Sequence, residues 1–180
     1  MRIISGLHKG RRVNAPKNLP TRPTTDRAKE ALFNILEHQY HFSEISVLDL
    51  FAGIGSISLE FSSRGVHDIS LVEKNINCIK HLNQTFEDLA YEAKIYKRDV
   101  FQYLEQNKQK YNLIFADPPY EITKEKLNEL ITLINTQRLL KNEDSQIIIE
   151  HNKFISMEDH SQFVQSRRYG LSVFSFFEKV

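Results

Sequence analysis

Disulfides, membrane spans and secretion signals are all missing from this sequence. Cys78 is the only cysteine among 180 residues, so no internal disulfide can form, as in most proteins of a reducing cytoplasm. No run of about 18 apolar residues occurs, so no segment is predicted to cross a membrane. The basic N-terminus lacks the apolar core of a signal peptide. We therefore expect a cytoplasmic, monomeric protein with length enough for one sizeable core.

Acidic residues are absent from the first 22 residues, which contain six basic ones. The whole chain has a net charge of +1, so the other 158 residues together carry −5. A basic arm on an acidic body is typical of nucleic-acid binders, although a basic tail can also be merely solubilising. We expect residues 1–24 to project as an arm from a main domain of residues 25–180. The candidate nucleic-acid contacts in this arm are Arg2, Lys9, Arg11, Arg12 and Lys17.

Short apolar runs alternate with amphipathic segments along the main domain. Seven strands are predicted, over residues 45–50, 69–73, 94–97, 112–116, 146–150, 162–168 and 171–179. Five helices are predicted, over residues 26–39, 57–63, 75–90, 100–107 and 123–136. Such alternation indicates a doubly wound, mostly parallel α/β sheet, which the last two strands close as an antiparallel hairpin. In the arm, residues 2–5 and 11–14 flank a loop that contains two glycines and are predicted to pair as a small β-hairpin.

Side-chain positions inside the helices follow from the same patterns. The helix over 75–90 should begin at Asn75 as its N-cap and bury Ile76, Ile79, Leu82, Phe86 and Leu89. Cys78 in this helix is predicted to be a buried structural thiol, away from every strand end. His8 in the arm is expected to be a solvated loop histidine, and Arg167 and Arg168 could either contact phosphate or be merely solvated. The seven histidines show no paired metal-ligand spacing, so we expect no metal.

The run Asn112–Ala116 ends abruptly in Asp117, two prolines and Tyr120. Prolines cannot continue a sheet ladder, because each lacks an N–H and has a fixed φ. The strand should therefore end in a stiff turn, at the sheet edge where open parallel sheets bind ligands. A carboxylate and an aromatic ring held there suit a flat, amine-bearing molecule. An ordinary strand-terminating turn is the alternative reading of this stretch taken alone.

A second motif, upstream, consists of a strand, the sequence Asp49-x-x-x-Gly53-x-Gly55 and a helix. Glycines there allow a backbone to approach a ligand closely. Glu73 follows 20 residues after Gly53, at a strand end where an acid can bind ribose hydroxyls. The glycines alone do not exclude a nicotinamide dinucleotide, since Ser58 is a tolerable third small residue. Asp49, however, would repel a pyrophosphate and attract an amino group, and Asp99 offers an acceptor for an adenine amine. Acids on successive strand ends fit S-adenosylmethionine.

The ordered motifs Asp49-x-Phe51-x-Gly53-x-Gly55, Glu73, Asp99 and Asp117-Pro118-Pro119-Tyr120 resemble those of class I S-adenosylmethionine-dependent methyltransferases. The turn is similar to that of enzymes that methylate exocyclic amines of bases. The N-terminal Arg2-Ile3-Ile4-Ser5-Gly6 and Gly10-Arg11, with Arg22-Pro23-Thr24-Thr25-Asp26-Arg27 and Glu30-x-Leu32-Phe33-Asn34, resemble the RsmD family specifically. That family comprises 16S ribosomal RNA guanine-N2 methyltransferases. The resemblance runs to Tyr169-Gly170 and Phe176-Phe177, with Ile54 and Ser58 as departures that affect only the fit of the cofactor.

The resemblance implies a Rossmann-like class I methyltransferase fold with strand order 3-2-1-4-5-7-6. It also implies 16S rRNA, in the small ribosomal subunit or an assembly intermediate, as the partner. The implied catalytic residues are Asp117, Pro118, Pro119 and Tyr120. The implied cofactor contacts are Arg22, Thr24, Asp49, Phe51, Gly53, Gly55, Glu73, Lys74, Asp99 and Val100. Two alternatives are a DNA adenine-N6 methyltransferase, for whose target-reading domain 180 residues leave no room, and a non-catalytic RNA-binding module. A nicotinamide oxidoreductase would share the glycine loop but would not explain the Asp-Pro-Pro-Tyr turn.

Overall fold

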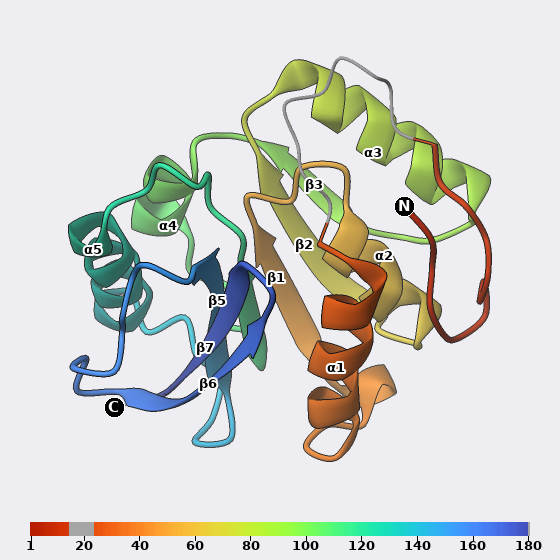
Figure 1. Cartoon of the computed structure of the whole chain (residues 1–180). Helices are drawn as coiled ribbons and strands as arrows, with labels where there is room; N and C mark the ends of the chain where they lie inside the picture. Colours follow the sequence, from red (N-terminus) through yellow and green to blue (C-terminus); the bar gives the residue numbers. More distant parts are fainter. Residues whose placement is uncertain (15–23, 180) are drawn as a thin grey trace.

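A computed structural model gives the fold of the chain and describes residues 1–14 and 24–179. Two predicted site residues, Lys17 and Arg22, lie outside these ranges. The sheet contains seven strands in the described part of the chain, in the predicted order β3-β2-β1-β4-β5-β7-β6 (Figure 1). The strands are β1 (Ser46–Leu50), β2 (Asp68–Glu73), β3 (Lys94–Lys97), β4 (Leu113–Ala116), β5 (Gln146–Asn152), β6 (Phe163–Tyr169) and β7 (Ser172–Glu178).

Pairing along the sheet is parallel from β3 to β5, and β7 then runs antiparallel to both β5 and β6. The chain proceeds from β1 outward to β2 and β3, and returns to the other side of β1 with β4. The reversal of strand order at β1 and β4 leaves a crevice at the carboxyl ends of these strands, the usual ligand position in open α/β sheets.

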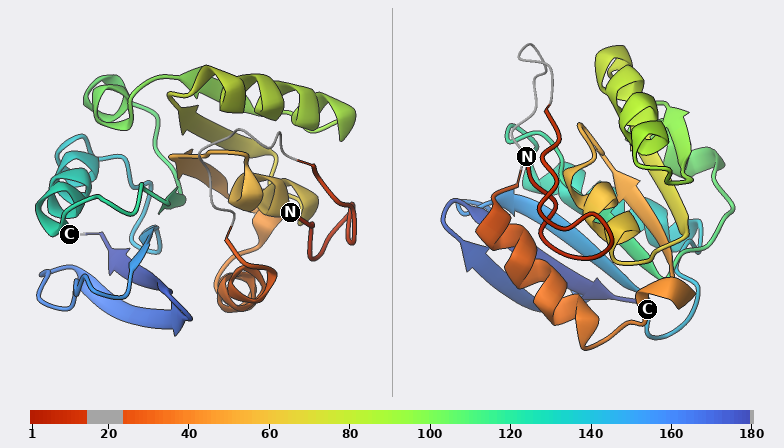
Figure 2. Two further views of the ribbon diagram at one scale, coloured as in Figure 1. Left: turned by 45° about the horizontal axis from the view of Figure 1, so that its top comes forward. Right: turned by 90° about the vertical axis from the view of Figure 1, so that its right-hand side faces the viewer.

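The described ranges contain five α-helices. They cover both faces of the sheet (Figures 1 and 2). Successive strand residues point to opposite faces, so the strands contribute to two separate apolar clusters. The first cluster joins one face to α1 (Asp26–Glu37), α2 (Ser56–Ser63) and α3 (Ile76–Asp88). The second joins the other face to α4 (Val100–Gln106) and α5 (Lys124–Thr136). No helix in the described ranges is long and apolar enough to cross a membrane.

The predicted helix starts are confirmed by their capping hydrogen bonds. The Thr25 side chain accepts from the Ala28 N–H, and Asn75 accepts from the first turn of α3. The predicted inner face of α3 needs one correction, because Ile76 is 43% exposed. It is the first residue of the helix, where the chain enters from the sheet edge and its side chain does not yet face the strands.

The N-terminal segment differs from the expected projecting hairpin. Its two branches do pair as an antiparallel hairpin, through the bridge between Arg2 and Arg12 and backbone hydrogen bonds such as that from Ile3 to the Arg11 carbonyl at 3.0 Å, but they do not project from the body. Ile3 and Val13 are buried in the first apolar cluster, against the main domain. Figures 1 and 2 show the segment folded back beside α2. Composition could not predict this, because the apolar residues that anchor the segment are few and separated by its basic ones.

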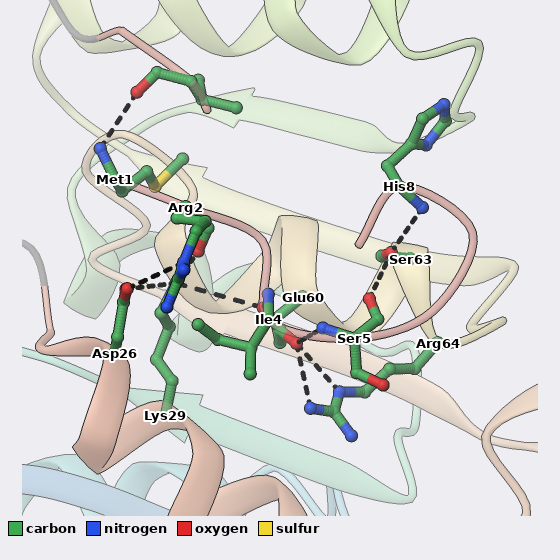
Figure 3. Close-up of polar contacts among 11 residues, drawn as sticks. Met1, Arg2, Ile4, Ser5, His8, Asp26, Lys29, Glu60, Ser63 and Arg64 are labelled. Carbon is green, nitrogen blue, oxygen red and sulfur yellow. Dashed lines mark hydrogen bonds and ion pairs between the residues drawn. The ribbon is translucent and has the colours of Figure 1, made fainter. Parts of the chain in front are cut away.

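A buried carboxylate holds this segment in place (Figure 3). Glu60 of α2 is fully buried and accepts from the backbone N–H groups of Ile4 at 2.8 Å and Ser5 at 3.0 Å. Arg64 donates to the same carboxylate at 3.0 Å, and the buried Lys29 lies 4.0 Å away. The Lys29 ammonium donates to the Arg2 carbonyl at 2.5 Å, and burial lowers its pKa despite the neighbouring acids. A charge this deeply buried is tolerated because it is paired and fully hydrogen-bonded.

Candidate active site

A cleft of about 1000 Å³ opens at the carboxyl ends of β1, β2, β4 and β5. The beginning of α1 and the turn between β6 and β7 complete its walls. Twelve residues predicted from the sequence as catalytic or cofactor contacts line it together: Thr24, Asp49, Phe51, Gly53, Glu73, Lys74, Asp99, Val100, Asp117, Pro118, Pro119 and Tyr120. The two motifs therefore form one site, although 68 residues separate Asp49 from Asp117 in the chain.

The loop after β1 is built from left-handed backbone. Phe51, Gly53 and Gly55 have φ values of 62°, 54° and 76°, a region that favours glycine and is uncommon for phenylalanine. Gly55, a predicted cofactor contact, does not line the cleft. A Cβ at Gly55 would lie 2.6 Å from the Leu82 side chain, so glycine is needed there for packing against α3. Phe51 lines the cleft and also packs against the second apolar cluster.

Asp49 is a buried carboxylate at the floor of the cleft. Burial raises its pKa from 3.8 to about 7, although the Ser58 hydroxyl donates to the carboxylate and opposes this shift. The Glu73 charge raises the pKa of Asp49 further. Ser58 is thus explained by its bond to Asp49 rather than by a pyrophosphate loop. A cationic ligand in the cleft would stabilise the ionised form of Asp49.

Two further acids are held by backbone donors. The Glu73 carboxylate accepts from the Gly53 N–H at 2.9 Å and from the Asn75 N–H at 2.7 Å. Asp99 is the N-cap of α4 and accepts from the Phe101 N–H at 3.0 Å. Each carboxylate thereby has a fixed orientation at the cleft before any ligand arrives, which reduces the cost of ordering it on binding.

Asp117 lines the cleft directly after β4, the strand that pairs with β1. Its N–H donates to the Leu50 carbonyl at 3.3 Å, which ties the turn to the end of β1. Burial, the Glu150 charge and the Asp49 charge, in that order, raise the pKa of Asp117 well above its usual value. Tyr120, at the rim, is 43% exposed, so one side of its ring can be covered by a ligand.

Several residues of the cleft were not predicted. Glu150, a buried acid in the second half of β5, follows the same pattern of an apolar run and an acid that singled out Asp49 and Glu73, and that pattern could have found it. Arg27 of α1 and Arg168 of β6 also line the cleft, where only tertiary structure brings them; from the sequence Arg168 was named as a possible phosphate contact, not as a cleft residue. Cys78 is buried as predicted but lines the cleft too, contrary to its expected distance from the strand ends. Burial and the Glu73 charge raise its pKa to about 11, so the thiol is unreactive.

The predicted nucleic-acid contacts that the structure describes lie outside the cleft. Lys9, Arg11 and Arg12 are exposed on the N-terminal segment, whereas Arg2 is paired with Asp26 at 3.2 Å. His8 is not a solvated loop residue: its Nδ1 lies 2.6 Å from the Tyr91 hydroxyl. Among the residues with described positions, no group of three or more histidine, cysteine or acidic side chains could hold a metal ion.

Comparison with known proteins gives matches over the whole chain. The model of the family described as Conserved hypothetical protein 95 matches residues 1–178. A Bacillus subtilis protein named Putative rRNA methyltransferase YlbH is 34% identical over 187 residues, covering 99% of each chain. Ribosomal RNA small subunit methyltransferase D of Escherichia coli K12 is 33% identical over 144 residues, covering 79% of this chain and 71% of that protein. The solved structure of Putative methyltransferase yhhF from Escherichia coli superposes with a TM-score of 0.85 and 27% identity, covering 99% and 97% of the two chains.

Proposed function

This chain belongs to the Conserved hypothetical protein 95 (RsmD) family of rRNA methyltransferases, and we propose that it methylates the exocyclic N2 amine of a guanine in 16S ribosomal RNA, with S-adenosylmethionine as methyl donor. One observation carries this proposal. The Asp-Pro-Pro-Tyr turn lines the same cleft as a set of acids suited to a cationic adenosine-containing cofactor. An oxidoreductase site would need no acceptor of this kind opposite its nucleotide.

The residues of the cleft fit S-adenosylmethionine. Asp49 would accept from the ammonium group, because an ion pair there relieves the cost of its burial. Glu73, already oriented by two backbone donors, would accept from the ribose hydroxyls, and Asp99 would lie near the adenine amine. When bound, the cofactor supplies an electrophilic methyl group on a sulfonium.

The chain's own groups then have to orient and activate a weak nucleophile. The lone pair of the guanine amine is delocalised into its ring, so the amine needs acceptors that hold its two hydrogens. Asp117 and the Pro118 carbonyl would take these hydrogens and direct the lone pair along the line of transfer. The carboxylate also stabilises the positive charge that develops on nitrogen before a proton leaves. Tyr120 would stack on the base, which must leave its strand to enter the cleft.

The basic residues of the N-terminal arm, predicted over residues 1–24, would contact the RNA outside the cleft, while Thr24 at the end of this arm lines the cleft itself. Lys9, Arg11 and Arg12 are exposed. Their loop is held by backbone bonds from Leu7 to the Ser63 carbonyl at 2.7 Å and from Gly10 to the Ile3 carbonyl at 2.9 Å. A basic loop on a fixed support can bind phosphates without first being ordered.

The test is a methyl-transfer assay on small ribosomal subunits from a strain that lacks this gene, followed by mapping of the modified base. N2-methylguanine in 16S rRNA is expected, and N6-methyladenine or no product would contradict the proposal. Asp117→Ala should lose most of the transfer rate while keeping its affinity for S-adenosylmethionine, since Asp117 would contact the acceptor. Near-parent transfer by this variant would place the chemistry elsewhere.

A further inference from the structure

A second acid lies beside the proposed catalytic carboxylate and has no role in the mechanism above. Strands β4 and β5 are parallel neighbours, with Ala116 opposite Ile149. Asp117 directly follows β4 and Glu150 follows Ile149 within β5, so the register brings the two acids next to each other near the carboxyl ends of the strands. Both line the cleft, and Glu150 is only 6% exposed.

Glu150 is held in position from the opposite wall. The Thr24 hydroxyl, itself buried just before α1, donates to Oε2 of Glu150 at 2.9 Å. A carboxyl group has two oxygens, and each of them can accept more than one hydrogen bond. The Glu150 charge is also the largest charged influence on Asp117, which agrees with their close approach. The acceptor end of the cleft therefore presents two adjacent carboxyl groups, of which Glu150 is oriented by Thr24.

A base that hydrogen-bonds to both carboxyl groups must present two neighbouring donors. Guanine carries N1–H next to its N2 amine, whereas adenine and cytosine carry an acceptor nitrogen next to their amines. An acceptor nitrogen opposite a buried carboxylate would leave both groups without a hydrogen, at a cost of about 1–3 kcal/mol or more. Sites built to bond a particular donor reject analogues that lack it far better than apolar pockets do.

We propose that Glu150 is a specificity-determining residue that accepts the N1–H of the target guanine, while Asp117 accepts from its N2 amine. This inference rests on the proposed function and deepens it. Thr24 would act through Glu150 as a positioning residue, since it fixes the carboxylate by its hydroxyl. Adenine would then be rejected as a target by Glu150 of β5 rather than by the Asp-Pro-Pro-Tyr turn.

The experiment uses 16S rRNA assembled by ligation, with either guanine or 2-aminopurine at the mapped target position. 2-Aminopurine keeps the amine but has an acceptor at N1. The parent protein should prefer guanine by roughly 100-fold in kcat/KM, the upper end for one mismatched buried group. In Glu150→Gln, whose amide can donate to N1, this ratio should fall at least about tenfold, because 2-aminopurine gains as guanine loses. Glu121→Gln, an exposed acid of the same cleft, is the matched control and should keep the parent ratio.

Two results would overturn the assignment. An unchanged ratio in Glu150→Gln would exclude Glu150 as the N1 contact. A parent protein that uses 2-aminopurine as well as guanine would exclude it without any variant, so a failure of Glu150→Gln to fold does not block the test. Either result, obtained while guanine N2 is still methylated, leaves the proposed function standing. A parent protein that methylates no guanine N2 would overturn both.

Discussion

The affinity for S-adenosylmethionine should depend on pH through Asp49. Only the ionised carboxylate attracts the ammonium group of the cofactor, and burial raises the Asp49 pKa to about 7 in the unliganded protein. The raised pKa means that protonated Asp49 predominates in mildly acidic solution. Binding must then remove this proton, so affinity is lost as the pH falls below the pKa.

The size of the effect follows from the fraction of Asp49 that is ionised. With a pKa of about 7, this fraction rises from roughly 3% at pH 5.5 to roughly half at pH 7. The affinity should therefore rise roughly 15-fold over this range, or about 1.6 kcal/mol. The range stops at pH 7 so that the amino group of the cofactor stays largely protonated.

Isothermal titration calorimetry at several pH values measures this dependence. Titrations at pH 6.5 in buffers of different ionisation enthalpy should show release of about three quarters of a proton per cofactor bound. Asp49→Asn is the control: it should bind about 1.5–3 kcal/mol more weakly at pH 7 and show no comparable pH dependence. An affinity that changes less than twofold in the parent, with no proton release, would refute the assignment of Asp49 to the ammonium group.

Three further predictions concern the ribose contact, the basic loop and the anchoring of the N-terminal segment. Glu73→Ala should weaken cofactor binding by about 1–3 kcal/mol in calorimetry. Glu73→Gln should be less affected, because its side chain can still accept from the Gly53 N–H. Unchanged affinity in both variants would contradict the assignment of Glu73 to the ribose. The double variant Arg11→Ala, Arg12→Ala should reduce the slope of log RNA affinity against log salt concentration by somewhat more than one unit, at roughly 0.7 per lost phosphate contact. An unaltered slope would make Arg167 and Arg168 the next candidates for the RNA contact. Gly6→Ala should lower the free energy of unfolding by about 2 kcal/mol or more, because its Cβ would lie 1.8 Å from the Ser63 carbonyl oxygen. Gly10 has a similar φ but open space around it, so the control Gly10→Ala should lower the free energy of unfolding by about 1 kcal/mol. Equal losses would mean that the segment does not pack against α2 as described.

The alternation of apolar runs and caps was sufficient to predict the sheet. Each strand end carried a local signal, such as the two prolines after Ala116 or the acids Glu73 and Asp99, and parallel topology places such ends at one edge. The strand order itself came from the family resemblance, since nothing local in β6 or β7 fixes which of them pairs with β5.

Apart from the burial of Ile76, the predictions that were wrong depended on contacts between distant segments. His8 meets Tyr91, and Cys78 reaches the cleft wall from α3, although neither sequence position has a neighbour that indicates it. Glu150 was missed for a different reason, because its strand was recognised but its terminal acid was not connected with Asp117. Asp117 and Glu150 are neighbours because of the register between β4 and β5, which neither strand's sequence reveals.

The most informative discrepancy is that the basic segment is built into the cofactor side of the domain. Helix α2 begins at Ser56, directly after the loop that carries Gly53 and Gly55, and its fifth residue, Glu60, binds the backbone of Ile4 and Ser5. All eight residues of α2 are buried, with the sheet on one side and the N-terminal segment on the other. Removing that segment would leave the Glu60 carboxylate without two of its donors, at a cost set by its burial. The loop that shapes the cofactor cleft and the segment proposed to bind RNA therefore share one structural support, which α2 provides.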